Sequence, residues 1–321
     1  MADAHKRKRH PKYKARYRIK NWHLYEEGLK ARGDITLWFS TDVMDAWLPS
    51  PTGKPGRQRQ YSGLAIETIL TLRLAFKLPL RQVEGFVNSL FSMMGLSLRS
   101  PGHTTLSRRN RNLAPIIRGD LRRKGPLDIV VDSTGLSIHG EGIWRQEKHG
   151  NHKRRGWRKL HIAVDNESLL LSCSITNEGR KDASEAGRLL KDFRGNMRSF
   201  TVDGGYNERG VYASVGKHSP KGSIIIPPRV NAQKYPAATG AIKHRNKHIK
   251  AIAAKGVYRW RRESGYYRQS VAENSIYRYK QIIGPRLRAR NENSRKVEAV
   301  LGCKILNRSR ALGIPQSYKV A

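Results

Sequence analysis

The stretch LDIVVDSTGLSIHG, residues 127–140, is the point at which the chain changes from helical spacing to runs of β-branched residues. Such runs are typical of strands that are buried on both faces, so this stretch predicts a strand, with Asp132 at the end of its apolar part. The segments GWRKLHIAVD (156–165) and SLLLSCSIT (168–176) have a similar composition and predict two further strands. Three successive strands therefore open this part of the chain.

Downstream of these strands, the pattern changes to an alternation of helices and strands. Residues 182–193 predict a helix, because Asp182 suits an N-cap and Glu185 follows three residues later, as in a capping box. The remaining elements are a strand that ends at Asp203, a helix at 208–218 and a strand at 222–228. Three strands followed by this alternation form a ribonuclease-H-like order, so we expect an α/β domain of that kind over residues 126–290.

A basic segment interrupts this domain. Residues 209–262 contain thirteen Lys or Arg and no Asp or Glu, and the part from about 229 to 262 has little periodicity. We interpret this part as an insertion that precedes another helix, which begins near residue 265. Residues 291–321 then predict a C-terminal helical tail.

The N-terminal third of the chain predicts a basic arm and a helical domain. Residues 1–20 hold nine Lys or Arg and one Asp, which is typical of a flexible arm that follows a phosphate backbone. Residues 21–125 predict helices, the last of them short and polar, with Arg108, Arg109 and Arg111. A helix, a turn and a basic helix form the order of a helix-turn-helix DNA reader. Three packed helices with a solvated basic face fit the same pattern.

The charge balance of the 321-residue chain narrows the class of its partner. The 63 Lys and Arg against 25 Asp and Glu give a formal charge of +38, which folding does not need and which favours a polyanion. Nucleic acid fits better than a membrane, because the sequence has no run of eighteen apolar residues. Composition alone also fits a ribosomal or architectural protein.

The cysteine and histidine content indicates neither a disulfide framework nor a zinc site. Cys173 and Cys303 are the only cysteines, so the expected location is the reducing cytoplasm. Histidines in basic loops are common, and the remaining metal candidates are of this kind: His139, His149, His152 and His161.

Three acids stand out in this basic chain. Asp132 and Asp203 each sit at the end of an apolar strand, with Gly135 and Gly204 following, and ligands bind at strand ends in α/β sheets. Glu273 is the single acid within residues 265–290, on a predicted helical stripe with Tyr266, Gln269, Tyr277 and Lys280. Turn residues and a solvated polar stripe are the ordinary interpretations. If the three carboxylates converge, two Mg²⁺ ions would relieve their repulsion and support in-line phosphoryl transfer.

The segments VVDSTGL, TVDGGYN and GYYRQSVAENSIYRYKQ resemble the three catalytic blocks of bacterial insertion-sequence DDE transposases, specifically the insertion-sequence-5 family. The third block of that family has Tyr, Arg, Glu and Lys at fixed spacing, and Tyr266, Glu273 and Lys280 match it. Gln269 stands at the Arg position, with Arg268 beside it. The resemblance covers essentially the whole chain, including LKARGDITLWF, PLRQVEGFVNSLF and WRKLHIAVD.

This resemblance implies an enzyme that binds the terminal inverted repeats of its element, cleaves the DNA ends and joins the 3′-hydroxyls to target DNA. It implies Asp132, Asp203 and Glu273 as catalytic ligands of Mg²⁺, with Mn²⁺ as a substitute. It also implies a homo-oligomer in a synaptic complex on the bacterial nucleoid. The expected DNA contacts are Lys280, Tyr266, Arg268, Arg278, Arg108, Arg109, Arg111 and Trp260, and for Trp260 packing within the insertion is the alternative. A transposase descendant that binds DNA without catalysis and a structural RNA-binding protein are the competing hypotheses.

Overall fold

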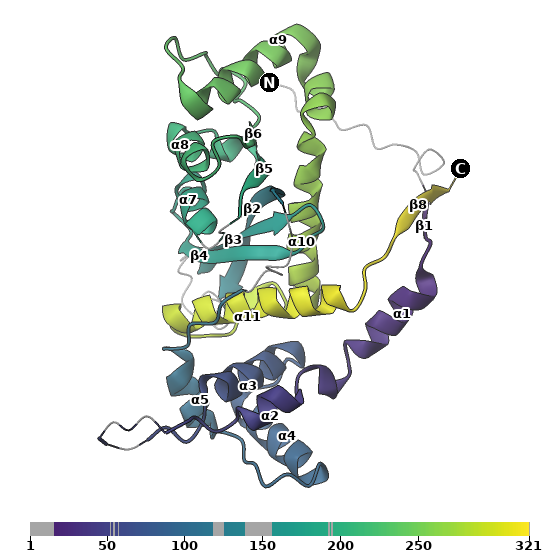
Figure 1. The fold of residues 1–321 in the computed structure, drawn as a ribbon, viewed down its shortest axis with the longest axis vertical. Helices are drawn as coiled ribbons and strands as arrows, with labels where there is room; N and C mark the ends of the chain where they lie inside the picture. Colours follow the sequence, from purple (N-terminus) through teal and green to yellow (C-terminus); the bar gives the residue numbers. More distant parts are fainter. Residues whose placement is uncertain are drawn as a thin grey trace, which may run out of the picture. The chain divides into compact units, whose positions relative to one another are not determined.

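The computed structural model describes residues 16–51, 53, 55–56, 58–117, 125–138, 156–191, 193 and 195–320 (Figure 1). The chain divides into two compact units, Phe39–Asn307 and Met1–Trp38 together with Arg308–Ala321, and each is described by itself. Residues 1–15 of the predicted basic arm lie outside the described residues. The predicted division at residues 20, 125 and 290 stays a prediction.

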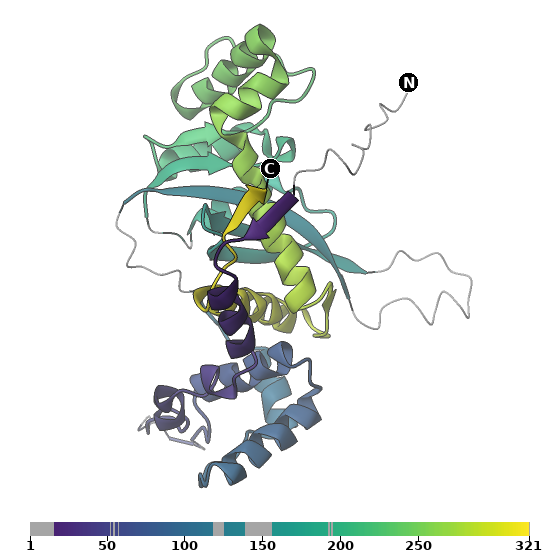
Figure 2. The ribbon, with the colours of Figure 1, turned by 90° about the vertical axis from the view of Figure 1, so that its right-hand side faces the viewer.

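The smaller unit brings together segments from the two ends of the chain. Strand β1 (Arg16–Ile19) pairs antiparallel with β8 (Ser317–Val320), as Figure 2 shows. Helix α1 (Trp22–Ala31) and the short 3₁₀ helix η2 (Ile35–Leu37) follow β1. The C-terminal tail therefore contains a strand, which the sequence did not predict.

Helices make up the first part of the larger unit: α2 (Thr41–Asp45), α3 (Gly63–Ala75), α4 (Leu80–Met93) and α5 (His103–Asn110). Their core is aromatic, because Trp47 and Phe39 lie with ring centroids 5.0 and 5.6 Å from that of Phe91. The Ser62 hydroxyl accepts a hydrogen bond from Ala65 N at 3.0 Å and caps α3. The helices predicted in this region are confirmed.

A six-stranded mixed sheet forms the centre of the larger unit. Its strands are β2 (Leu127–Ile138), β3 (Trp157–Asp165), β4 (Leu170–Asn177), β5 (Met197–Thr201), β6 (Ser223–Ile225) and β7 (Arg286–Leu287). The order is β4-β3-β2-β5-β6, with β7 paired to the far end of β2. β2, β3 and β4 are antiparallel neighbours, and β5 and β6 run parallel to β2. The predicted mixed α/β class is confirmed.

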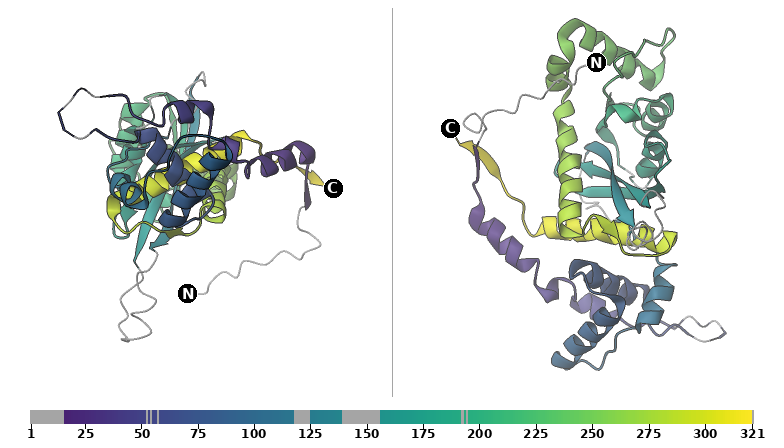
Figure 3. Two further views of the ribbon diagram at one scale, coloured as in Figure 1. Left: turned by 90° about the horizontal axis from the view of Figure 1, so that it is seen from below. Right: turned by 180° about the vertical axis from the view of Figure 1, so that it is seen from behind.

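Helices cover both faces of this sheet (Figure 3). Helices α7 (Ala183–Lys191) and α8 (Arg209–His218) pack on one face, and α10 (Gln269–Ile282) and α11 (Glu292–Ala311) pack on the other. Along β2, Ile129 and Val131 belong to the α7 side of the core, while Val130 and Leu136 belong to the α10 side. Because side chains alternate along a strand, Asp132 falls on the α10 face and Ser133 on the α7 face.

Two sequence expectations for this region need correction. Asp132 does not end its strand, because β2 continues to Ile138 through antiparallel pairing with β3. The predicted insertion is also more regular than its sequence suggested, since it contains the 3₁₀ helix η4 (Gly240–Ile242) and the long helix α9 (Lys243–Ser264). Helix α9 is kinked at Gly256, whose φ of 76° lies in the left-handed region that favours glycine.

Among the helices described, none has the length and apolar character needed to cross a bilayer.

Candidate active site

Asp132 lies in the middle of β2, partly buried beneath α10. Its Oδ1 accepts a hydrogen bond from Ser133 N at 2.8 Å. Burial is the main cause that raises the pKa of Asp132 to about 6; charge repulsion from Asp203, Glu273 and Asp182 contributes to this rise, and the Ser133 hydrogen bond opposes it. The Asp132 carboxylate is therefore partly shielded from solvent and lies within electrostatic range of three other acids.

Asp203 follows β5, the parallel neighbour of β2. Val130 is paired with Thr201, so the register continued by two residues sets Asp203 beside Asp132 on the same face of the sheet. Asp203 Oδ1 accepts a hydrogen bond from Gly205 N at 2.9 Å and caps the 3₁₀ helix η3 (Gly204–Tyr206). Burial is the main cause of the raised pKa of Asp203. Asp132 thus lies on β2, and Asp203 lies just after the end of the adjacent strand β5.

Glu273 comes from α10, which packs on the α10 face of β2 through Ala272, Ile276 and Tyr279. Glu273 itself is exposed at the edge of this packed stripe. Its charge contributes to the raised pKa of Asp132, as stated above, so the helix brings the third acid within electrostatic range of the sheet. Lys280 lies on the same helix, half-buried, seven residues and about 10 Å further along.

Tyr266 lies in the 3₁₀ helix η5 (Tyr266–Arg268), directly before α10, and not within the helical stripe that the sequence predicted. Burial raises the pKa of its hydroxyl, and Asp203, Glu273 and Asp132 each add to the effect. Tyr266 is therefore the one aromatic of the third block whose environment includes all three predicted catalytic acids.

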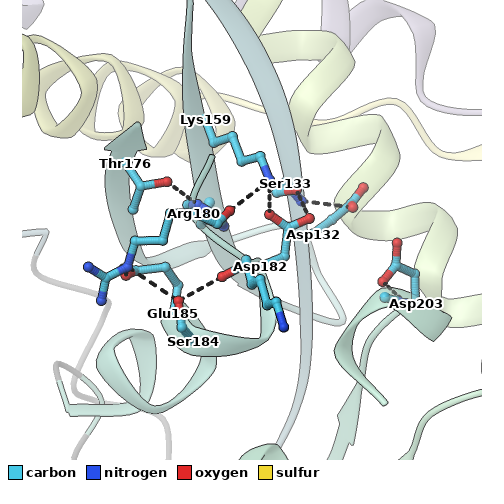
Figure 4. Close-up of polar contacts among 12 residues, drawn as sticks. Asp132, Ser133, Lys159, Thr176, Arg180, Asp182, Ser184, Glu185 and Asp203 are labelled. Carbon is cyan, nitrogen blue, oxygen red and sulfur yellow. Dashed lines mark hydrogen bonds and ion pairs between the residues drawn. The ribbon is translucent and has the colours of Figure 1, made fainter. Parts of the chain in front are cut away.

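A fourth carboxylate, which the sequence analysis did not assign to the site, lies on the α7 face behind Asp132. Asp182 accepts hydrogen bonds from Ser133 Oγ at 3.0 Å and from Lys159 Nζ at 2.9 Å (Figure 4). The predicted capping box is therefore wrong: the Asp182 side chain points to β2 and β3, and Glu185 pairs with Arg180 at 2.7 Å. The sequence could have pointed to the contact between Asp182 and Lys159. Side chains alternate along WRKLHIAVD, which puts Lys159 on the opposite face of the strand from the buried Leu160.

Gln269, the departure from the resembled pattern, is buried under the sheet. Its Nε2 donates to the carbonyl of Val131 at 3.1 Å, and its Oε1 has no hydrogen-bond partner within the described structure. The neighbouring Arg268 does not take the same place. Its guanidinium lies 3.7 Å from Asp128, four residues before Asp132 along β2. Four residues of strand span about 13 Å, so the Arg268 guanidinium meets β2 well before Asp132.

Trp260 of α9 is buried, with 2% of its surface exposed. Its Nε1 donates to His248 Nδ1 at 2.9 Å, and its ring lies 5.6 Å from that of Tyr266. This arrangement matches the packing interpretation of Trp260, and it links the insertion to the segment that carries Tyr266.

The predicted basic residues of the helical region fall into two groups. Arg109 donates to the carbonyl of Tyr61, and burial lowers its pKa, so it supports the fold between α5 and the start of α3. Arg108 and Arg111 are exposed and line a groove in the larger unit. Arg278 lies half-buried on α10.

Of the four candidate zinc histidines, only His161 is described, and it is buried with Nε2 2.8 Å from Thr176 Oγ1.

The donor set can be tested against a divalent metal. Asp132, Asp203 and Glu273 offer hard oxygen donors, the type that Mg²⁺ takes; burial raises the pKa of Asp132 and Asp203, and the charges of Asp203 and Glu273 add to the shift of Asp132. A cation there would relieve this repulsion, so the chemistry fits. Among the described residues, however, no three acids, histidines or cysteines are close enough together to enclose an ion as they stand.

Comparison with known proteins assigns the chain to a family. The profile of a family described as "Transposase DDE domain" matches residues 123–308, and a second profile with the same description matches residues 30–141. Among solved structures, the chain is similar to a piggyBac transposase synaptic complex with hairpin DNA, with a TM-score of 0.35, 10% identity and coverage of 90% of this chain and 77% of that one. It is also similar to a Mos1 transposase paired-end complex with left transposon end, with a TM-score of 0.21, 9% identity and coverage of 73% and 81%. Such low scores add nothing to the assignment, which rests on the profile that matches more than half of the sequence. The chain belongs to the transposase DDE domain family.

Proposed function

We propose that this protein is a bacterial transposase of the insertion-sequence-5 type, which cleaves the ends of its element and joins the 3′-hydroxyls to target DNA. The observation that carries the proposal is the pair Asp132, on β2, and Asp203, just after the parallel neighbour β5, both with raised pKa values. Two neighbouring carboxylates repel each other, which gives a structural turn residue no advantage. A divalent cation, in contrast, is bound more tightly by two carboxylates than by one. The division into a DNA-binding helical region and a ribonuclease-H-like catalytic domain is part of the proposal.

Divalent-metal dependence is a property of the DDE family. In this chain, Asp132, Asp203 and Glu273 would hold the ions, Mg²⁺ by preference and Mn²⁺ as a substitute. When bound, the metal supplies charge neutralisation at the scissile phosphate and activation of the attacking oxygen. The Ser133 backbone N–H fixes one oxygen of Asp132 and thereby orients the other.

The remaining roles in this proposal follow from position. Lys280, Arg278 and Tyr266 lie on or next to α10 and would contact phosphates near the cleaved end. Arg268 would contact the backbone further along β2, toward Asp128. Arg108 and Arg111 would hold DNA in the helical region. Because two element ends must be joined together, we propose a homo-oligomer that acts on the nucleoid in the cytoplasm.

A second candidate is a DNA-binding protein that descends from a transposase and has no catalysis. The observation that favours it is the exposure of Glu273, together with the absence of a closed three-acid group among the described residues. The two candidates differ in one measurable respect, which is metal-dependent strand cleavage.

The test uses the full-length protein and a duplex that carries the inverted repeat found next to its reading frame. Incubation with Mg²⁺ should yield a nick at the element end, and EDTA should prevent it. Specific binding of this duplex without any nick, in Mg²⁺ or in Mn²⁺, would reject the transposase proposal in favour of the second candidate.

A further inference from the structure

A basic groove with a volume of about 1060 Å³ lies in the larger unit, between the N-terminal helices and the segment that leads into α11. Six exposed cations line it. Four come from the helical side and two from the segment before α11: Lys77, Arg81, Arg108, Arg111, Arg288 and Arg290. The two walls are joined, since Arg288 donates a hydrogen bond to the carbonyl of Lys77 at 2.7 Å.

The exposed cations of this groove form no close ion pairs with acids in the described part of the chain. None of the six forms an ion pair with an acid in the part of the chain that the structure describes, and no Asp or Glu lines the groove. The nearby acids are engaged elsewhere: Glu84 accepts hydrogen bonds from His103, and Glu298 accepts them from the backbone of Arg288 and Ala289. Glu298 acts electrostatically on Arg73 and Arg288, so it offsets part of the positive charge, and most of the exposed cations of the groove keep theirs.

Two lining residues also carry buried polar atoms without a hydrogen-bond partner in the described structure. These atoms are Arg73 Nε and Asn110 Oδ1. Both atoms are shielded from solvent, so the exposed cations are the groups of this groove that a ligand can reach.

We propose that this groove binds the phosphodiester backbone of duplex DNA, as a second DNA site separate from the carboxylates. The proposal rests on the transposase function proposed above. A row of unpaired Arg and Lys suits phosphates, and the lining has no Phe, Tyr or Trp on which unpaired bases would stack. The groove therefore favours sequence-independent contact with a duplex over capture of a single strand.

The sheet sets the distance between the two sites. β2 extends from Asp132 to Ile138, and Ile138 is paired with Leu287, the neighbour of Arg288. Six residues of strand span about 20 Å. Duplex DNA rises about 3.4 Å per base pair, so a straight duplex that runs along β2 would place phosphates at the groove about six base pairs from a phosphate held at Asp132.

The experiment measures the salt dependence of DNA binding by the full-length protein without metal. The probe is a fluorescein-labelled duplex of about 30 base pairs and random sequence, titrated by anisotropy from about 50 to about 200 mM KCl. The groove variant is Arg81→Ala/Arg290→Ala, with one change in each wall. Lys217→Ala/Lys221→Ala removes the same charge from exposed positions on and just after α8.

We expect the slope of log K against log salt to decrease by roughly two units in the groove variant, because each lost phosphate contact removes about 0.9. The charge-retaining variant Arg81→Lys/Arg290→Lys should keep the slope, and the α8 control should change it little. An unchanged slope in the groove variant, or an equal decrease in the α8 control, would overturn the proposal. Because the probe is random DNA without metal, failure of end cleavage would not alter this result.

Discussion

Replacement of Asp132 by Asn tests whether the candidate site is electrostatically strained in the absence of metal. The pKa of Asp132 in the folded protein is about 6 against an ordinary value of 3.8, and burial is the main cause. One pKa unit corresponds to about 1.4 kcal/mol, so ionisation of this group near pH 7 opposes folding by up to about 3 kcal/mol. Asn keeps the acceptor for Ser133 N but cannot ionise, so Asp132→Asn should stabilise the metal-free protein by about 1–3 kcal/mol.

The pH dependence fixes the sign of this effect. The pKa of Asp132 is raised by folding, so the destabilisation is complete above the folded value and absent below the unfolded one. The advantage of the Asn variant should therefore be about 3 kcal/mol near pH 7.5 and decrease to about 1 kcal/mol near pH 4.5.

Urea unfolding in EDTA at several pH values measures this advantage, with exposed Asp45→Asn as a control that should be neutral. Addition of Mg²⁺ should then stabilise the wild type by about 1.4 kcal/mol for each tenfold excess over its dissociation constant, and leave the variant unchanged. A variant that is less stable than the wild type in EDTA at neutral pH, or an advantage that does not depend on pH, would refute the reasoning.

Three further substitutions test individual contacts. Lys159→Met should cost about 1–3 kcal/mol in urea unfolding, because it leaves the partly buried Asp182 without its cation, and adding Asp182→Asn should recover part of this loss. Trp260→Phe should lower stability by about 1–3 kcal/mol through the lost hydrogen bond to His248, with DNA affinity unchanged; the reverse outcome would favour base stacking. Gln269→Arg should raise the cleavage rate or leave it unchanged, and a large loss would show that the site is arranged around the Gln269 contact with Val131.

The sequence predicted the central strands well, because burial on both faces leaves a continuous apolar run that few other elements produce. The placement of Asp132 at the end of a strand was wrong for a physical reason. From Asp132 onward the strand is less apolar, and it continues because each residue up to Ser137 is paired with β3. Pairing with a distant strand leaves little local signal. The same reason explains the missed strand β8, whose partner β1 lies at the opposite end of the chain.

The three predicted acids were identified from their order and spacing, but their environment was not. Asp182 was predicted to cap a helix because Asp is common at the N-cap position. Its side chain instead accepts hydrogen bonds from Ser133 on β2 and Lys159 on β3, which lie far from it in the sequence. The helix α9 was also missed, since its Lys and Arg residues are good helix formers but its apolar residues follow no clear period. The contacts of Asp182 with Ser133 and Lys159 are tertiary, so only the folded chain shows them.

The central claim is that Glu273 acts with Asp132 and Asp203 in metal-dependent cleavage. Glu273→Gln tests it most directly, because Gln keeps the shape of an exposed side chain and removes the charge that a hard divalent ion needs. The measurement pairs a gel shift with Mg²⁺-dependent cleavage on the same inverted-repeat duplex. The account predicts that binding persists, since Arg and Lys make the phosphate contacts, while cleavage is lost. Cleavage at the wild-type rate by Glu273→Gln would contradict the catalytic assignment and leave Glu273 as a surface residue.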